Sequence, residues 1–240
     1  HVKDAMFEVV FNNEGEKKKV VIPPSKVTTI ILNAGTSLSS DSVQLALTNN
    51  IDIIFAEYDG MPLGRIWHSK LGSTTKIRKQ QLIASLNNTG FTYVKEWILN
   101  KLENQIDFLT LLKKHRSQQA EYLDFQIETI KKSLDNIDKF KFDKIEDAAE
   151  LIRGNEGFAG KIYFETLSKL LSKEYQFNGR SKRPALDMFN AFLNYAYGIL
   201  YSRVEKALLI AGIDPYLGFL HRDDYNQKSM VFDFIEPFRT

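Results

Sequence analysis

The sequence predicts an α+β fold, in which a small N-terminal β domain of residues 1–75 precedes a larger all-α domain of residues 76–240. The first observation is a change in hydrophobic period. Short β-branched and aromatic segments before residue 67 give way, from about residue 75, to apolar residues spaced three or four apart. The second is composition: apolar residues make up 43% of the 240 positions and charged residues 26%, as in chains that fold around a core.

The N-terminal part contains several short segments that are typical of strands, separated by polar turns. Asp59 and Gly60 form a favourable hairpin turn, because glycine adopts positive φ at little cost. One short helix interrupts the strands, with Ser40 or Asp41 as its N-terminal cap. The predicted strands cover residues 5–11, 20–22, 27–32, 51–58 and 61–67.

After a linker at residues 68–75, the apolar positions follow the helical period. The longest stripe runs from Phe91 to Leu112, and Pro184 occupies the first position of a later helix, where its missing N–H costs nothing. A final short helix is predicted over residues 229–238. Of the other predicted helices, one carries apolar positions from 123 to 137, one begins at about residue 144 and carries them to 164, and one runs from Pro184 until Gly212.

Composition and motifs exclude several classes of function. Cysteine is absent, which rules out disulfide frameworks, thiol nucleophiles and Cys-ligated zinc sites. The sequence has no serine-hydrolase elbow, phosphate-binding loop, dinucleotide-binding fingerprint or zinc-protease motif. The formal charge of +2 is too balanced to indicate a nucleic-acid-binding protein by itself, so any basic surface must be local.

No segment suggests a membrane protein. The longest apolar run, residues 207–213, is far shorter than the roughly 18 residues that a span requires, and no signal peptide is visible. We therefore expect a cytoplasmic protein without membrane contact. The chain begins at His1 rather than Met and ends at Thr240, so we also expect it to be part of a longer protein whose α domain is truncated at its C-terminal end.

Four polar residues lie on or beside predicted helices with apolar neighbours. Asp233 and Glu236 are three residues apart and share one helix face, while His221 lies twelve residues before Asp233 and Glu156 precedes Gly157. One imidazole with two or three carboxylates is a donor set that suits Mg²⁺ or Mn²⁺. The alternative is an ordinary solvated face, because acid pairs at this spacing are common on surfaces and Glu156 is 65 residues from His221.

A second feature is local basic charge. Residues 161–206 contain eight basic and four acidic side chains, and aromatic residues lie close to the basic ones in sequence. This pattern suits contact with a nucleic-acid backbone, and the alternative is a solvated loop without a ligand. The candidate DNA-binding residues are Lys161, Arg180, Lys182 and Arg183.

Three segments of the α domain, with one of the β domain, resemble the CRISPR-associated integrase, the Cas protein that inserts new spacers during adaptation. The β-domain segment is Asp59-Gly60-x-Pro62-Leu63-Gly64-Arg65. The α-domain segments are Glu156-Gly157-x-Ala159-x-x-x-Tyr163-Phe164, Phe177-x-Gly179-Arg180-x-x-Arg183-Pro184-x-x-Asp187-x-x-Asn190, and His221 followed by Ser229, Asp233, Glu236 and Phe238-Arg239. The resemblance covers nearly the whole chain.

The resemblance implies an architecture and a site. In that family the β domain forms a homodimer and the α-helical domain carries a divalent-metal site. Matched by position, the implied metal ligands are Glu156, His221 and Glu236, with Asp233 as a further acidic member of the catalytic set. The resemblance also implies Mg²⁺ or Mn²⁺ as the cofactor. The implied partners are double-stranded spacer and repeat DNA and a small ferredoxin-fold companion protein of the adaptation machinery.

We therefore expect residues 1–75 to dimerise and residues 76–240 to act as a metal-dependent DNA integrase and endonuclease, in which a 3′-hydroxyl of spacer DNA attacks a phosphodiester of the CRISPR array. A repair-type or transposon-borne nuclease or integrase acting on branched DNA would use the same site and differ in the DNA ends it joins. A non-catalytic DNA-binding subunit would need no metal.

The sequence departs from the family pattern at Lys161, where Arg is common, and at Asn226-Gln227, where Gly-Arg is usual.

Overall fold

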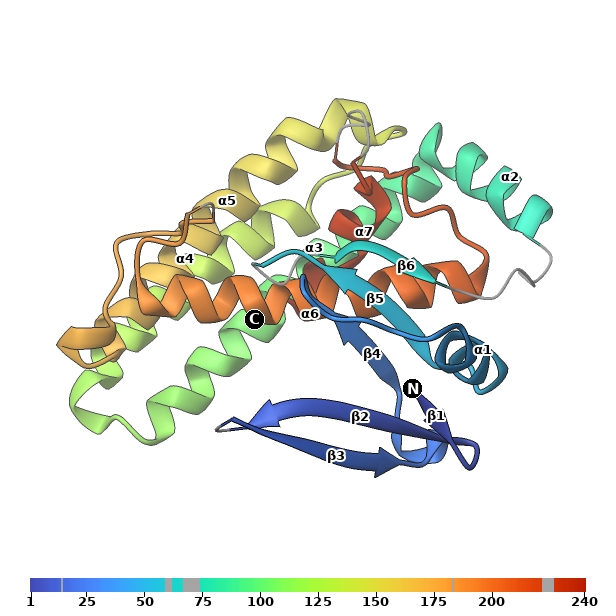
Figure 1. Cartoon of the computed structure of the whole chain (residues 1–240). Coiled ribbons are helices and arrows are strands. Elements are labelled where there is room, and N and C mark those ends of the chain that lie inside the picture. Colours follow the sequence, from blue (N-terminus) through green and yellow to red (C-terminus); the bar gives the residue numbers. More distant parts are fainter. Residues whose placement is uncertain (14, 59–61, 67–73, 183, 222–226) are drawn as a thin grey trace. The chain divides into compact units, whose positions relative to one another are not determined.

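The computed structural model describes residues 1–13, 15–58, 62–66, 74–182, 184–221 and 227–240. It shows a mixed α+β fold, as the change of hydrophobic period predicted (Figure 1). The chain divides into two compact units, residues 1–71 and 72–240, close to the predicted boundary. The predicted turn at Asp59-Gly60, most of the predicted linker at 68–75 and the candidate DNA-binding residue Arg183 lie outside the described residues.

The first unit contains two three-stranded sheets. One is antiparallel, with β1 (Val2–Lys3), β2 (Met6–Asn13) and β3 (Glu16–Ile22) in that order. In the other, β5 (Asp52–Ala56) lies between β4 (Thr29–Leu32), which is parallel to it, and β6 (Pro62–Ile66), which is antiparallel. The parallel pair requires a crossover, which α1 (Ser40–Thr48) provides. The short 3₁₀ helix η1 (Pro24–Lys26) precedes β4.

A small core holds the first unit together. Phe7 of β2, Ala46 of α1 and Ile53 of β5 are each 5% exposed or less, and Ile51 joins them. The hairpin of β2 and β3 extends beyond this core. Its apolar residues are more than two-fifths exposed, and they are Val9, Val10, Phe11, Val20 and Val21. The hairpin therefore presents apolar surface that no described part of its own unit covers.

Several predicted boundaries in this unit were wrong in detail, and three of these differences have a visible cause. The predicted strand at 5–11 begins one residue later, because Asp4 and Ala5 adopt positive φ in the tight turn after β1. The strand predicted at 20–22 begins at Glu16, because pairing with β2 draws the intervening polar residues into the ladder. The helix cap is Ser39 rather than Ser40 or Asp41, since its hydroxyl oxygen accepts a hydrogen bond from Ser42 N at 3.3 Å.

The second unit is helical. Its three central helices, α3 (Asn88–Lys114), α4 (Ala120–Asp138) and α5 (Ile145–Leu170), pack against one another (Figure 1). The remaining helices are α2 (Thr74–Ser85), η2 (Ser117–Gln119), η3 (Lys173–Tyr175), α6 (Met188–Ala211), α7 (Ser229–Phe234) and η4 (Glu236–Phe238). None of the helices in the described ranges is both long enough and apolar enough to cross a bilayer.

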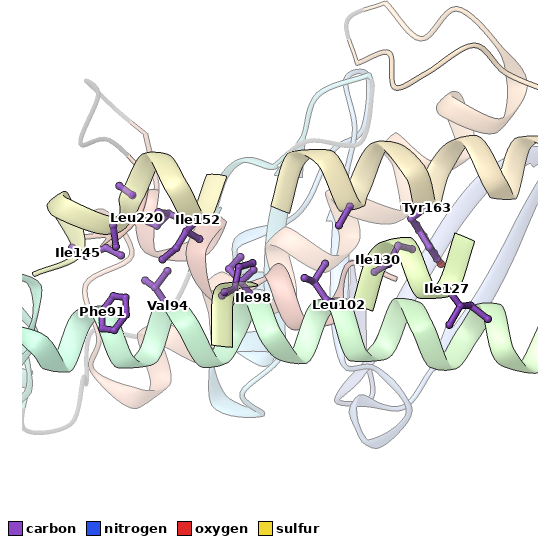
Figure 2. Packing of buried hydrophobic residues seen from close by; sticks show 14 of the residues in the cluster. Phe91, Val94, Ile98, Leu102, Ile127, Ile130, Ile145, Ile152, Tyr163 and Leu220 are labelled. Atoms are coloured by element: carbon purple, nitrogen blue, oxygen red, sulfur yellow. The ribbon is translucent and has the colours of Figure 1, made fainter. Parts of the chain in front are cut away.

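The predicted apolar stripes form the main core of this unit. Figure 2 shows Val94, Ile98 and Leu102 of α3 facing residues of α4 and α5, among them Ile130 and Ile152. Each of these five side chains is 1% exposed or less. A second cluster, centred on Leu208 and Ile235, joins α6 to α7. The elements that carry Glu156, His221 and Glu236 thus all pack on or beside α3.

Several helix ends differ from the prediction, and two of these differences have a visible cause. Pro184 is not the first residue of a helix, because α6 begins at Met188 and Asp187 caps it, its carboxylate accepting from Asn190 N at 2.8 Å. The helix predicted at 229–238 ends at Phe234 and continues as the 3₁₀ turn η4, in which Pro237 has no N–H to donate to a continuing α-helix.

Replacing Leu102 by Ala tests the central packing. Leu102 is fully buried, so the lost apolar surface and the resulting cavity should lower the free energy of unfolding by about 2–5 kcal/mol. Leu111→Ala on the same helix is the matched control, because Leu111 is 50% exposed and should change stability by only about 0.5 kcal/mol. Urea unfolding followed by circular dichroism measures both, and equal losses would contradict the assigned core.

Candidate active site

A buried lysine joins two of the predicted metal ligands. Lys101 of α3 is 4% exposed, and its ammonium donates to Glu156 Oε1 and, at 2.6 Å, to Glu236 Oε2. Glu156 comes from α5 and Glu236 from η4, so two carboxylates 80 positions apart in the chain share one cation. The structure therefore brings together two of the three predicted ligands on a residue that the sequence reasoning did not single out.

Glu236 is the more buried of the two carboxylates, with a side chain 4% exposed against 26% for Glu156. Its second oxygen, Oε1, accepts from Arg239 Nη1 at 2.6 Å. Burial by itself would raise the pKa of the Glu236 carboxyl, but the charges and hydrogen bonds of Lys101 and Arg239 outweigh it and hold this pKa below the usual value. Glu236 is thus held as a carboxylate by two cations.

Asp233 has a different environment from Glu236, although only three residues separate them. Its carboxylate accepts backbone N–H bonds from Phe219 at 2.5 Å, Leu220 at 2.9 Å and His221 at 3.0 Å. The same carboxylate lies 2.5 Å from Nδ1 of the His221 ring. Asp233 therefore fixes both the backbone and the ring of His221.

The contact between Asp233 and His221 determines which ring nitrogen is available. A carboxylate accepts, so in the neutral imidazole Nδ1 carries the proton and Nε2 presents its lone pair. The approach of the two segments also depends on Gly218, where a Cβ would lie 2.5 Å from Ser229 Cβ and 3.0 Å from an oxygen of Asp233. Any larger residue at that position would push the His221 segment away from α7.

The predicted residues form two groups in this structure. Glu156 and Glu236 surround Lys101, whereas His221 contacts Asp233. Within the described ranges, no three His, Asp or Glu side chains stand in metal-binding geometry. One reason is visible in the contacts, because an ammonium bonds to both carboxylates.

Lys101 could have been found from the sequence. It lies three residues after Ile98 and one before Leu102, within the apolar stripe of the long helix, and Gln105 follows at the same face. All four residues are buried. A lysine in a buried stripe requires a partner of opposite charge, and this requirement is the signal that the periodicity contained.

The basic segment, here the residues from Arg180 to Lys182 before α6, lies next to this site. The Arg180 guanidinium donates to the side-chain oxygens of Asn190 at 2.6 Å and Asn194 at 2.7 Å. Its carbon lies 5.4 Å from the ring centre of Tyr197, and that of Arg239 lies 5.0 Å from the same ring centre. Arg180 is therefore anchored within the protein, and Tyr197 links it to the cation that holds Glu236.

The two candidate DNA-binding lysines are exposed. Partial desolvation by neighbouring protein atoms, and after it the charges of Arg239 and Arg180, lower the pKa of Lys182. Lys161 lies on α5 beyond Glu156 and forms a loose pair with Glu165 at 3.9 Å. Both lysines are free to contact a ligand at the surface, and their role in DNA binding stays a prediction.

A pH series tests the environment of Glu236. Because its pKa is lower in the folded state, its contribution to stability is present above about pH 4.5, the value in the unfolded chain, and is lost as the pH falls through the folded value. The stability of the wild type relative to Glu236→Gln should therefore be greater at pH 7 than at pH 3. Urea unfolding at both pH values measures this, with the exposed Glu150→Gln as control. A difference independent of pH would contradict the assignment.

The sequence and fold match known proteins over nearly the whole chain. A family model described as CRISPR associated protein Cas1 matches residues 2–240. The CRISPR-associated endonuclease Cas1 1 of Archaeoglobus fulgidus is 35% identical over 93% of this chain and 68% of its own length. The chain therefore spans about two thirds of that relative.

Two solved structures share the fold. A casposase bound to an integration product is 24% identical, with a TM-score of 0.77 over 100% of this chain and 66% of its own. A chain of a Cas6-RT-Cas1–Cas2 complex is 20% identical, with a TM-score of 0.72 over 99% of this chain and 25% of its own. The family model and the relative from A. fulgidus, which is named an endonuclease, show that this chain belongs to the Cas1 family.

Proposed function

We propose that this chain is a divalent-metal-dependent DNA endonuclease and integrase that inserts spacer DNA into a CRISPR array. The observation that carries the proposal is the meeting of Glu156 and Glu236 around one cation at a partly open position. Membership of the Cas1 family supports a nuclease or integrase, and the pair of carboxylates on the buried Lys101 supports the metal dependence.

The donor set suits Mg²⁺ or Mn²⁺. The pair already accommodates a positive charge, carboxylate oxygens are the hard ligands these ions prefer, and the imidazole of His221 offers Nε2. Glu156, Glu236 and His221 would hold the ion. Bound there, it supplies polarisation of a phosphodiester oxygen and lowers the pKa of a coordinated hydroxyl or water.

The residues of this chain have separate tasks in the reaction. The 3′-oxygen of spacer DNA forms a bond to phosphorus as the bond to the leaving 3′-oxygen of the repeat strand breaks; in cleavage, water takes the place of the spacer hydroxyl. Arg239 keeps Glu236 ionised and oriented. Asp233 holds the His221 ring in the tautomer that leaves Nε2 free, the kind of outer contact that typically changes metal affinity or activity by about 10–100-fold.

We propose that Lys161, Arg180, Lys182 and Arg183 form the basic surface that receives the DNA backbone. Lys161 and Lys182 are exposed, so they are the direct contacts. Arg180 instead shapes the segment, because amide oxygens on α6 already accept its N–H groups.

The exposed hairpin supports the proposed homodimer. It exposes apolar side chains that a second copy of the chain would cover, namely those of residues 9–11 and of Val20 and Val21. We further propose that the dimer works in the cytoplasm with the ferredoxin-fold companion; the solved complex of similar fold contains Cas2 as well as Cas1.

A transposon-borne integrase is the second candidate, favoured by the likeness to a casposase bound to an integration product. The two differ in the ends they join, so the products formed with repeat DNA and with transposon-end DNA distinguish them. A non-catalytic DNA-binding subunit is disfavoured, since two carboxylates held on a buried lysine have no task in backbone binding.

Glu156→Gln tests the chemistry. Loss of one carboxylate should lower Mn²⁺-dependent cleavage and strand joining of a labelled duplex by about a hundredfold or more, about 3 kcal/mol in the barrier. Glu150→Gln, an exposed site on the same helix, is the matched control and should retain activity. Wild-type rates in a folded Glu156→Gln protein would contradict the proposal.

The DNA surface has a separate test. In Lys161→Ala/Lys182→Ala, each lost phosphate contact should reduce the slope of log K against log salt by about 0.9, because fewer condensed counterions are released. Lys113→Ala, a lysine paired with Asp124 at the far end of α3, is the control, and Glu156→Gln should leave the slope unchanged. Fluorescence anisotropy at four salt concentrations measures the slopes. An unchanged slope in the double variant would place the DNA elsewhere.

A further inference from the structure

The ammonium of Lys101 lies between the two carboxylates that are predicted to hold a metal ion. This ammonium bonds to one oxygen of each predicted carboxylate ligand, and the lysine side chain is only 5% exposed. The lone pairs that hold this ammonium are the ones that a divalent ion would require. The Lys101 ammonium and a divalent ion would therefore compete for the same carboxylate lone pairs.

The charges of the site support the same conclusion. Lys101 and Arg239 carry two positive charges and Glu156 and Glu236 two negative charges, so the cluster is neutral before any metal binds. A divalent ion added to the intact cluster would lie beside an ammonium, and like charges at such distances repel strongly in a buried site. Departure of the ammonium removes this repulsion and releases both carboxylates.

The two carboxylates depend on Lys101 to different degrees. Glu236 keeps its bond to Arg239 when Lys101 is absent, so its position does not rest on the lysine alone. Glu156 is one-quarter exposed, and among the described residues only Lys101 donates a hydrogen bond to its carboxylate, so Lys101 is what draws it toward Glu236. A lysine side chain has a long flexible stem, which lets the ammonium leave while α3 stays in place.

We propose that Lys101 is a positioning residue that acts as a resident counter-ion: it holds Glu156 and Glu236 together in the metal-free protein and is displaced when the metal enters. This inference rests on the proposed metal dependence. The metal-binding arrangement is then a minority state of the metal-free protein, and the apparent affinity for metal is reduced by the fraction of molecules in which the ammonium holds the pair.

Direct binding of Mn²⁺ tests the proposal without an activity assay. If Lys101 holds the pair in about nine of ten molecules, Lys101→Met should bind Mn²⁺ about tenfold more tightly than wild type, measured by the electron paramagnetic resonance signal of free Mn²⁺. Without metal the variant should melt at a lower temperature, and Mn²⁺ should raise its melting temperature more than that of wild type. Lys113→Met, on the same helix and paired with Asp124 at 2.6 Å, is the control.

The outcomes are distinguishable. Absence of Mn²⁺ binding in wild type would overturn the proposed metal dependence and this inference with it. Binding in wild type with equal or weaker binding in Lys101→Met would overturn this inference alone, because a lysine with a purely structural role would give that result. If Lys101→Met fails to fold, the test uses the wild-type protein instead. Its lysines are acylated with and without Mn²⁺, and mass spectrometry measures the labelling of each. Mn²⁺ should then increase labelling of Lys101 relative to Lys113, and unchanged labelling would overturn the proposal.

Discussion

The buried ion cluster is the constraint on which the α-helical unit depends. Lys101 enters the interior from α3, and an unpaired ammonium there would carry a large desolvation cost. Glu156 and Glu236 meet this need, and in doing so they tie α5 and the C-terminal turn η4 to the central helix. The apolar stripes bring the helices together, but the charges determine which turns of these helices face one another.

A second constraint separates the roles of two acids that look equivalent in sequence. Asp233 and Glu236 share a local pattern of i and i+3, yet Asp233 accepts three backbone N–H groups and contacts an imidazole, whereas Glu236 contacts two cations. The short α7 presents Asp233 to the segment before His221, and the 3₁₀ turn after it presents Glu236 to α3. One helix end therefore serves both the imidazole and the carboxylate pair.

Tyr197 connects the basic segment to the carboxylate pair, because arginines from both sides contact its ring. Arg180 and Arg239 both lie over its ring, and Arg239 in turn holds Glu236. Cation–π contacts of this kind are modest individually, about 0.5–2 kcal/mol. Their effect here is geometric, since they fix the distance between the segment that precedes α6 and the site that it borders.

The sequence by itself determined the fold class, the order of the elements, the apolar stripes of α3 and α4, and the identity of Glu156, His221, Asp233 and Glu236 as candidates, because hydrophobic period and residue chemistry are local properties. It did not determine helix ends such as the start of α6, where a cap at Asp187 prevailed over Pro184. Only the tertiary structure decided that Glu156 and Glu236 meet on Lys101 and that Asp233 holds His221. These contacts join residues 12 to 135 positions apart, and only packing of the helices brings such residues within hydrogen-bond distance.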